Sequence, residues 1–227
     1  FFDADGLIYV RQKLRLTKVS WLSFLCAMVL LSVAKVCLSN YIFLQRDVRD
    51  VAREWVEHSV PSRAKVAFDG AFYMPRLQPA VTQLFRKREE ILSRPSPEKI
   101  QLKRIDLLIK LARKDLSQPR YEVFFLKESE VEEKFLFAKP TVPYDVAALE
   151  KIGIQYVITY QGEKPRNGSF SQDLEKHATL VAKFTPYRNQ SREWSIDRFP
   201  LTGGPFLWSE LVARERNGQI LKVYRLS

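Results

Sequence analysis

Asp69 is the carboxylate with the best position for chemistry in this sequence. It ends the predicted strand 65–69, which Gly70 follows. Ligands of open α/β sheets bind at the carboxyl ends of the strands, so Asp69 is a weak ligand candidate. The alternative is that Asp69 caps a turn or pairs with a nearby arginine. Another group of acids forms a charged stretch that we expect in a solvated loop: Glu128, Glu130, Glu132 and Glu133.

The histidines, cysteines and glycines follow no established catalytic or metal-binding pattern. His58 and His177 are far apart in sequence, and neither has a second ligand at metal spacing. Cys26 and Cys37 share one apolar stretch, where a helix would separate them by about 16 Å, too far for a disulfide. There is no dinucleotide-binding, phosphate-binding or hydrolase glycine motif. We therefore predict no catalytic residue, no metal site and no bound cofactor in this chain.

Two short segments imitate ligand-binding loops. Asp3 and Asp5 resemble the start of an EF-hand, but that loop needs a glutamate at its twelfth position, where this chain has Leu14. The segment 203–205, Gly-Gly-Pro, is too short to surround a phosphate and predicts a turn. Neither segment is retained as a site.

The elements that would position these residues alternate along residues 47–227. Helices are expected at 47–60, 79–93, 96–114, 145–151, 171–177 and 207–216. Strands are expected at 65–69, 121–126, 155–159, 179–184 and 220–226. Alternation of this kind predicts an α/β fold, here one transmembrane helix followed by a small, mostly parallel α/β sandwich domain.

The predicted transmembrane helix is the apolar stretch 19–38. Its 20 residues would extend about 30 Å as a helix, which matches the hydrocarbon core of a bilayer. The stretch is longer than a signal-peptide core and no small-residue cleavage site follows it. Apolar residues all round its surface also argue against a buried soluble helix. Lys35, near the far end, can extend its ammonium group to the interface.

The charges on either side of this stretch predict its orientation. Four cations precede it within eight residues, whereas the following segment balances its charges: Arg11, Lys13, Arg15 and Lys18 against Arg46, Asp47, Arg49 and Asp50. The positive-inside rule places residues 1–18 in a cytoplasmic loop and residues 47–227 in an extracytoplasmic domain. We therefore expect an integral protein of the plasma or inner membrane.

The net charge of +11 allows two kinds of anionic partner. Nucleic-acid binding would need a clustered basic stripe with a recognition element, and the basic residues here are spread out, so we expect no nucleic acid. Nine of the basic residues of the domain lie in the helices 79–93 and 96–114. Their basic faces are expected to be solvated, and contact with anionic membrane lipid is the functional alternative.

The segment 47–66, DVRDVAREWVEHSVPSRAKV, resembles a junction found in GT-C glycosyltransferases, which are polytopic membrane enzymes. The protein O-mannosyltransferase and aminoarabinose transferase group joins its last membrane helix to an extracytoplasmic domain through a similar segment. The matching positions are Asp47, Arg49, Ala52, Trp55, Val56, Pro61 and Val66. Arg63 departs from the pattern, since glycine is common there. Later segments that resemble the same domain are 149–158, 184–187 and 223–226.

The resemblance implies a function that this chain would serve only in part. Such enzymes transfer a sugar from a polyprenyl-phosphate carrier with inversion, using an acidic residue as general base. Their catalytic acids lie in the first extracytoplasmic loop, which has no counterpart here, so no catalytic residue carries over. The chain begins at Phe1, and we expect a fragment that is inactive alone. The alternative is a single-pass, membrane-anchored α/β binding or interaction domain without enzymatic activity.

Overall fold

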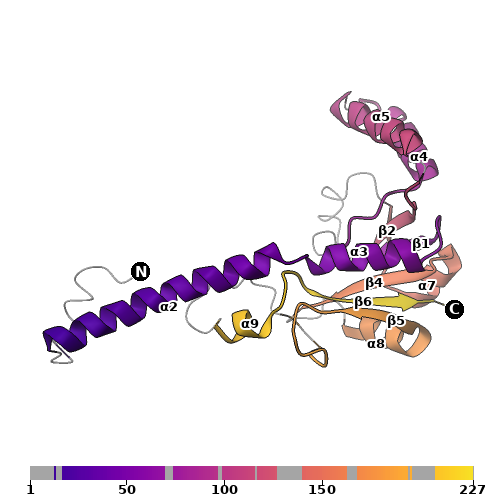
Figure 1. Cartoon of the computed structure of the whole chain (residues 1–227). Helices are drawn as coiled ribbons and strands as arrows, with labels where there is room; N and C mark the ends of the chain where they lie inside the picture. The colour runs from indigo at the N-terminus through magenta and orange to yellow at the C-terminus, as the bar shows by residue number, and fades with distance from the viewer. Residues whose placement is uncertain are drawn as a thin grey trace.

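The computed structural model shows a long N-terminal helix that projects from an α/β domain (Figure 1). The predicted fold class, an apolar helix followed by an α/β domain with a mostly parallel sheet, is confirmed. The structure describes residues 13, 17–69, 74–96, 99–115, 117–126, 140–162, 168–193, 195 and 208–226.

The N-terminal helix α2 (Lys18–Leu44) contains the predicted span and continues for six residues beyond Leu38. Its 27 residues extend about 40 Å, enough to cross the hydrocarbon core of a bilayer. Most of its described side chains face away from the rest of the protein, as those of a lipid-facing helix do. Length and composition make α2 a candidate membrane anchor, although a signal sequence near the N-terminus meets the same criteria.

Three residues separate the helix α3 (Val48–Ser59) from the end of α2. Asp47 is the N-cap of α3, because its carboxylate Oδ1 accepts the Arg49 backbone N–H at 2.8 Å. One face of α3 is buried against the sheet, through Val48, Ala52 and Val56. Pro61 follows the C-cap residue Val60 and ends the helix.

The sheet has six strands in the order β3-β2-β1-β4-β6-β5. The strands are β1 (Lys65–Phe68), β2 (Glu122–Leu126), β3 (Thr141–Val142), β4 (Tyr156–Gln161), β5 (Thr179–Phe184) and β6 (Ile220–Arg225). The first four are parallel, whereas β6 pairs antiparallel with both β4 and β5. The two-residue strand β3 was not predicted, since it is too short to show alternation.

The remaining helices differ from their predicted limits mainly at their ends. They are α4 (Val81–Leu92), α5 (Lys99–Lys114), α7 (Val146–Ile152), α8 (Gly168–His177) and α9 (Trp208–Ala213). The prediction that the last helix reaches residue 216 was wrong, because Arg214 leaves the helix to form a bridge with Tyr187. The predicted N-terminal proline of α5, Pro97, lies outside the described residues.

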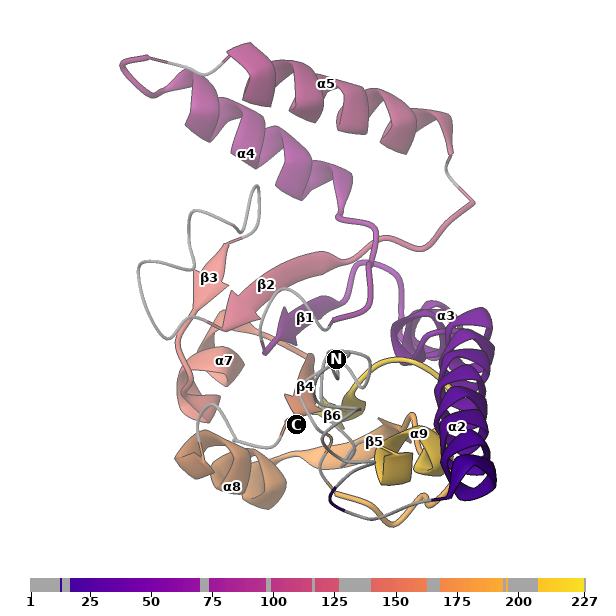
Figure 2. The ribbon, with the colours of Figure 1, turned by 90° about the vertical axis from the view of Figure 1, so that its left-hand side faces the viewer.

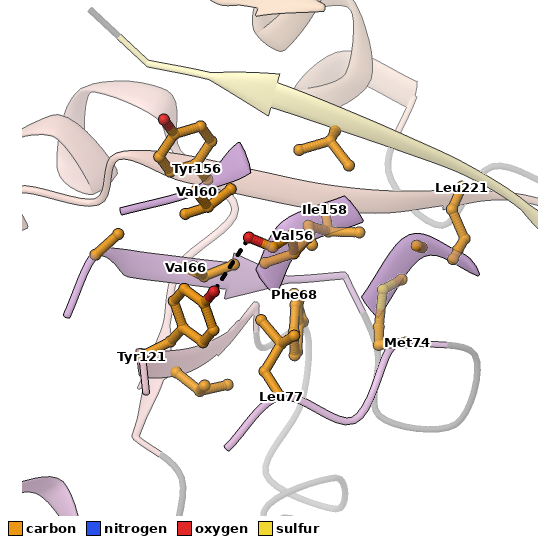
Figure 3. Packing of buried hydrophobic residues seen from close by; sticks show 14 of the residues in the cluster. Val56, Val60, Val66, Phe68, Met74, Leu77, Tyr121, Tyr156, Ile158 and Leu221 are labelled. Atoms are coloured by element: carbon orange, nitrogen blue, oxygen red, sulfur yellow. Dashed lines mark hydrogen bonds between the residues drawn. The ribbon is translucent and has the colours of Figure 1, made fainter. Parts of the chain in front are cut away.

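Alternate side chains of the strands build a core on each face of the sheet. Val66, Phe68 and Ile158 pack with the buried face of α3. Figure 3 shows this cluster, including the Tyr121 hydroxyl that donates a 3.1 Å hydrogen bond to the Val56 carbonyl. The opposite face, which includes Ala67, packs with α7 and α8. The result is a three-layer domain, with α3 on one side of the sheet and α7 and α8 on the other.

The helices α4 and α5 form a hairpin with a small core of its own, at the β2 side of the sheet (Figure 2). Leu84, Ile91, Ile105 and Ile109 are buried between the two helices. Gln83 joins the hairpin to the sheet, since its side-chain amide exchanges hydrogen bonds with the backbone N–H and carbonyl of Val123. This amide satisfies backbone groups on the side of β2 that β3 is too short to cover.

The buried Tyr121 predicts how the stability of the core changes at high pH. Burial, helped by the charge of Glu57, raises the pKa of Tyr121 from 10.0 to about 12. The unfolded chain loses this proton near pH 10 and the folded chain does not, so the stabilisation is present below pH 10 and is lost between pH 10 and 12. Urea unfolding of the chain in detergent should show a loss of about 2–3 kcal/mol across that window. Tyr121→Phe should flatten this part of the curve, and an unchanged slope would contradict the assignment.

Candidate functional site

The point where the strand order reverses lies between β1 and β4. Crossover connections leave β1 toward β2 on one side, and β4 lies on the other side. Open α/β sheets bind ligands beside the carboxyl ends of such strands. Asp69 directly follows β1 at this edge, and its backbone N–H donates to the Ile158 carbonyl of β4 at 2.9 Å. The predicted position of Asp69 at the carboxyl end of the first strand is therefore correct.

The Asp69 side chain is buried, with 7% of the residue exposed. The Tyr144 hydroxyl donates to its Oδ1 at 2.6 Å, and the Tyr144 ring packs edge-on against Phe170 of α8. The contact therefore ties the end of β1 to the segment that enters α7. Sequence reasoning missed Tyr144, because 75 residues separate the two partners. A ligand-binding role for Asp69 stays a prediction, whereas its role as a tether is visible.

A groove of about 550 Å³ lies next to this tether, between α7 and α8. Its charged lining includes Asp145, Glu150, Asp173 and His177. Asp145 already caps α7, since its Oδ1 accepts the Ala148 backbone N–H at 3.2 Å. Within the described ranges, no three acidic, histidine or cysteine side chains are grouped closely enough to hold a metal ion. The acidic group at 128–133 lies outside those ranges.

Of the other residues considered in the sequence, the two histidines occupy helix ends. His58 is in the last turn of α3, with its Nδ1 2.6 Å from the Glu54 carbonyl oxygen. His177 ends α8 and is exposed. Cys26 and Cys37 are free and exposed along α2. Asp3, Asp5 and the segment 203–205 lie outside the described residues.

The most constrained polar site is the junction where α2 meets the domain. The Asp47 carboxylate caps α3, binds the Arg49 guanidinium at 2.9 and 3.0 Å, and accepts the Asn217 side-chain amide at 3.1 Å. The Val48 backbone N–H donates to the Asn217 carbonyl at 2.9 Å. The helix start is therefore fastened to the turn that precedes β6, 170 residues further along the chain.

Gly218 allows this close approach. Its φ angle is +118°, and a Cβ atom there would lie 2.8 Å from the Cβ of Val48. Both the backbone conformation and the space therefore exclude a side chain without a local shift. Asn-Gly is a sequence typical of tight turns, and the structure adds that α3 packs directly on Asn217-Gly218.

A buried cluster of charges lies next to the junction, between α9 and the segment after β5. Glu210 accepts hydrogen bonds from the Tyr187 hydroxyl at 2.8 Å and from the Arg192 guanidinium at 2.6 Å. The Arg214 guanidinium donates to the Tyr187 oxygen at 3.1 Å and to the Gly218 carbonyl at 2.9 Å. Burial raises the pKa of Tyr187, which keeps its hydroxyl protonated as the donor. The sequence signal for this buried charge cluster was the placement of Glu210 next to the apolar residues Trp208 and Leu211.

The outer face of α5 carries a row of exposed apolar side chains with basic side chains around it. Ile100, Leu107 and Leu111 are 82%, 55% and 53% exposed, and they align on the side opposite the α4 contact. Exposed cations flank the row: Lys99, Lys103, Arg104, Lys110 and Lys114. In Figure 2, α5 is the outer helix of the hairpin and lies on the far side of the domain from α2. Contact of this face with anionic lipid stays a prediction.

Comparison of the chain with protein-family models, with curated proteins and with solved structures found no match. The likeness to GT-C glycosyltransferases therefore stays a hypothesis based on residues 47–66 and the later segments.

The close contact between Gly218 and Val48 predicts that alanine destabilises the protein at Gly218 but not at Gly168. Gly218→Ala forces a left-handed residue and a clash with Val48, so unfolding of the chain in detergent should become easier by about 1–3 kcal/mol. The matched control is Gly168→Ala at the start of α8, where an added Cβ meets no atom within 4 Å. That control should be neutral or slightly stabilising. Equal effects of the two substitutions would contradict the proposed contact.

The Asp69 tether predicts a coupled pair. Tyr144→Phe removes a donor from a buried carboxylate and should lower the free energy of unfolding by about 1.5–3 kcal/mol. In a double-mutant cycle, the same change in an Asp69→Asn background should cost clearly less. Additive costs in the thermal or urea unfolding of the four proteins would show that the two side chains act independently.

Proposed function

We propose that this chain is the membrane-anchored accessory domain of a polytopic GT-C-like glycosyltransferase that uses a polyprenyl-phosphate-linked sugar. The chain would supply one span, α2, and the extracytoplasmic α/β domain that follows it. The catalytic acid would belong to a part of the enzyme outside this chain. Residues 47–227 would therefore have a structural role in the enzyme and would not take part in the chemical step.

The observation that carries the proposal is the way residues 47–66 fold. The resemblance names Asp47, which caps α3, and Ala52 and Val56, which form its buried face. Trp55 packs edge-on against Phe184 with ring centroids 5.9 Å apart. Each of these positions therefore has a structural use between α2 and the sheet, which supports the likeness to the family junction.

The one departure from the family pattern also supports the proposal. Arg63, where glycine is common, has a φ angle of +71°, the left-handed conformation that glycine adopts at least cost. Its backbone N–H donates to the Arg120 carbonyl at 2.6 Å, so the turn is fixed by pairing beside β2. The turn thus has the backbone conformation that glycine favours, which fits the family pattern although the residue here is arginine.

A second candidate function is a single-pass, anchored binding domain. The exposed row Ile100, Leu107 and Leu111 favours this candidate, since contiguous exposed apolar residues often mark interaction surfaces. The cations that flank the row would suit an acidic partner.

Membrane assays should separate the two candidates. Membranes with the whole gene product should transfer sugar from a polyprenyl-phosphate donor, and membranes with residues 1–227 alone should not. Transfer by residues 1–227 alone would contradict the placement of the catalytic acid elsewhere. Absence of transfer by the whole gene product, together with a reading frame that encodes no further apolar spans, would favour the binding domain.

The predicted orientation is checked in the same membranes by cysteine labelling. In a Cys26→Ser, Cys37→Ser background, Ser62→Cys should react with an impermeant maleimide added to spheroplasts, and Lys13→Cys should react only after lysis. Both positions are exposed, so burial does not bias the comparison. Reversed labelling would overturn the extracytoplasmic location.

A further inference from the structure

The short helix α9 lies beside the C-terminal turns of α2 in both views of the molecule (Figures 1 and 2). Ser39 and Ile42 are the buried residues of α2, with 2% and 3% exposed. The other residues of α2 are half-buried or exposed. Among the described residues, α2 is therefore most deeply buried just after the predicted end of the span at Leu38.

The positions of Ser39 and Ile42 along α2 indicate how deep in a bilayer the contact between α2 and the domain would lie. They follow Leu38 by one and four residues, so they lie about 1.5 and 6 Å beyond it along the axis. A bilayer of about 40–45 Å with a hydrocarbon core of about 30 Å has a headgroup layer of about 5–8 Å on each side. The part of α2 that packs with the domain thus coincides with the headgroup layer.

The side chains around this contact suit the boundary between headgroups and acyl chains. Trp208 and Val212 are four residues apart on one face of α9, where Trp208 is half-buried and Val212 is 57% exposed. On α2, Tyr41 and Phe43 are exposed next to the contact. Tryptophan and tyrosine are enriched at this depth, because their rings are apolar and their tips are polar.

The buried charge cluster holds α9 in place. Glu210 lies between Trp208 and Val212 in sequence but faces the domain, where Arg192 and Tyr187 bind its two oxygens. Leu211 is also buried in the domain. The helix therefore cannot leave the domain without exposing these groups, and its depth in the membrane would be the depth of the whole domain.

We propose that α9 and the last turns of α2 form an interfacial seat, in which Trp208 and Val212 contact the headgroup and acyl boundary of the bilayer. The seat would set the height of the α/β domain above the membrane. It rests on the membrane span of the proposed function, and its occupant is the lipid bilayer that α2 crosses.

Site-directed spin labelling of the full chain in phospholipid nanodiscs tests the seat. Single cysteines at Val212, Val29 and Ser62, in the Cys26→Ser, Cys37→Ser background, would carry a nitroxide. Collision with a water-soluble nickel chelate is compared with collision with oxygen, which concentrates in the bilayer. All three positions are exposed in the protein, so differences report the surroundings.

The seat predicts that nickel collision at Val212 is several-fold lower than at Ser62, with Val29 lower still. A label at Val212 as accessible to nickel as at Ser62, while Val29 is shielded, would overturn the seat and leave the span intact. Accessible labels at both Val29 and Val212 would overturn the span itself, and the seat with it.

A second measurement does not depend on the label. Lipids with brominated acyl chains should quench part of the tryptophan emission, and Trp208→Phe should remove a part of the quenched fraction. The matched control is Trp55→Phe, since Trp55 packs on Phe184 within the domain and should contribute little to quenching. Equal changes for the two variants would contradict the contact between Trp208 and lipid.

Discussion

The structure depends on the capped start of α3. Asp47 closes the helix, holds Arg49 and accepts Asn217, while the next residue, Val48, packs on Gly218. These contacts fix the direction in which the chain leaves α2 relative to β6. Because α3 also forms one wall of the core, contacts of the folded domain set the path of the chain from α2 to the sheet. A flexible linker would give no such coupling.

A second set of contacts reinforces the first at the turn that precedes β6. Arg214 donates to the Gly218 carbonyl and to Tyr187, so the turn that receives Asp47 also binds the cluster that holds Glu210 and α9. A buried carboxylate with several charge-assisted hydrogen bonds is costly to leave unpaired. The cluster therefore favours one arrangement of α9 against the domain, and α9 in turn lies against α2. The domain is held to the long helix at both the start of α3 and the position of α9.

Two further features of the domain, the Asp69 site and the α4–α5 hairpin, lie away from α2. The parallel strands place Asp69 at the reversal of strand order, where its carboxylate is occupied by Tyr144. The α4–α5 hairpin has a core of its own and extends from the β2 side of the sheet. The outer face of α5 carries exposed apolar side chains with basic residues around them.

Local patterns in the sequence determined much of this architecture. Continuous hydrophobicity predicted α2, and the pattern of residues 47–60 predicted the helix α3. The spacing of strands and helices predicted a mostly parallel sheet, and it placed Asp69 at the end of β1. Each of these features depends on residues within a few turns or one strand, where propensity and burial act on neighbours in the chain.

Only the tertiary structure decided which distant residues meet. The pairing of Asp47 with Asn217, the Tyr144 tether on Asp69 and the Glu210 cluster join residues from 18 to 170 positions apart. Hydrogen bonds of this kind form only after strand order and helix packing have brought the partners together, and many polar residues in the sequence could have served equally well. The sequence by itself therefore determined a long apolar helix and an α/β domain, whereas packing decided how the two are joined.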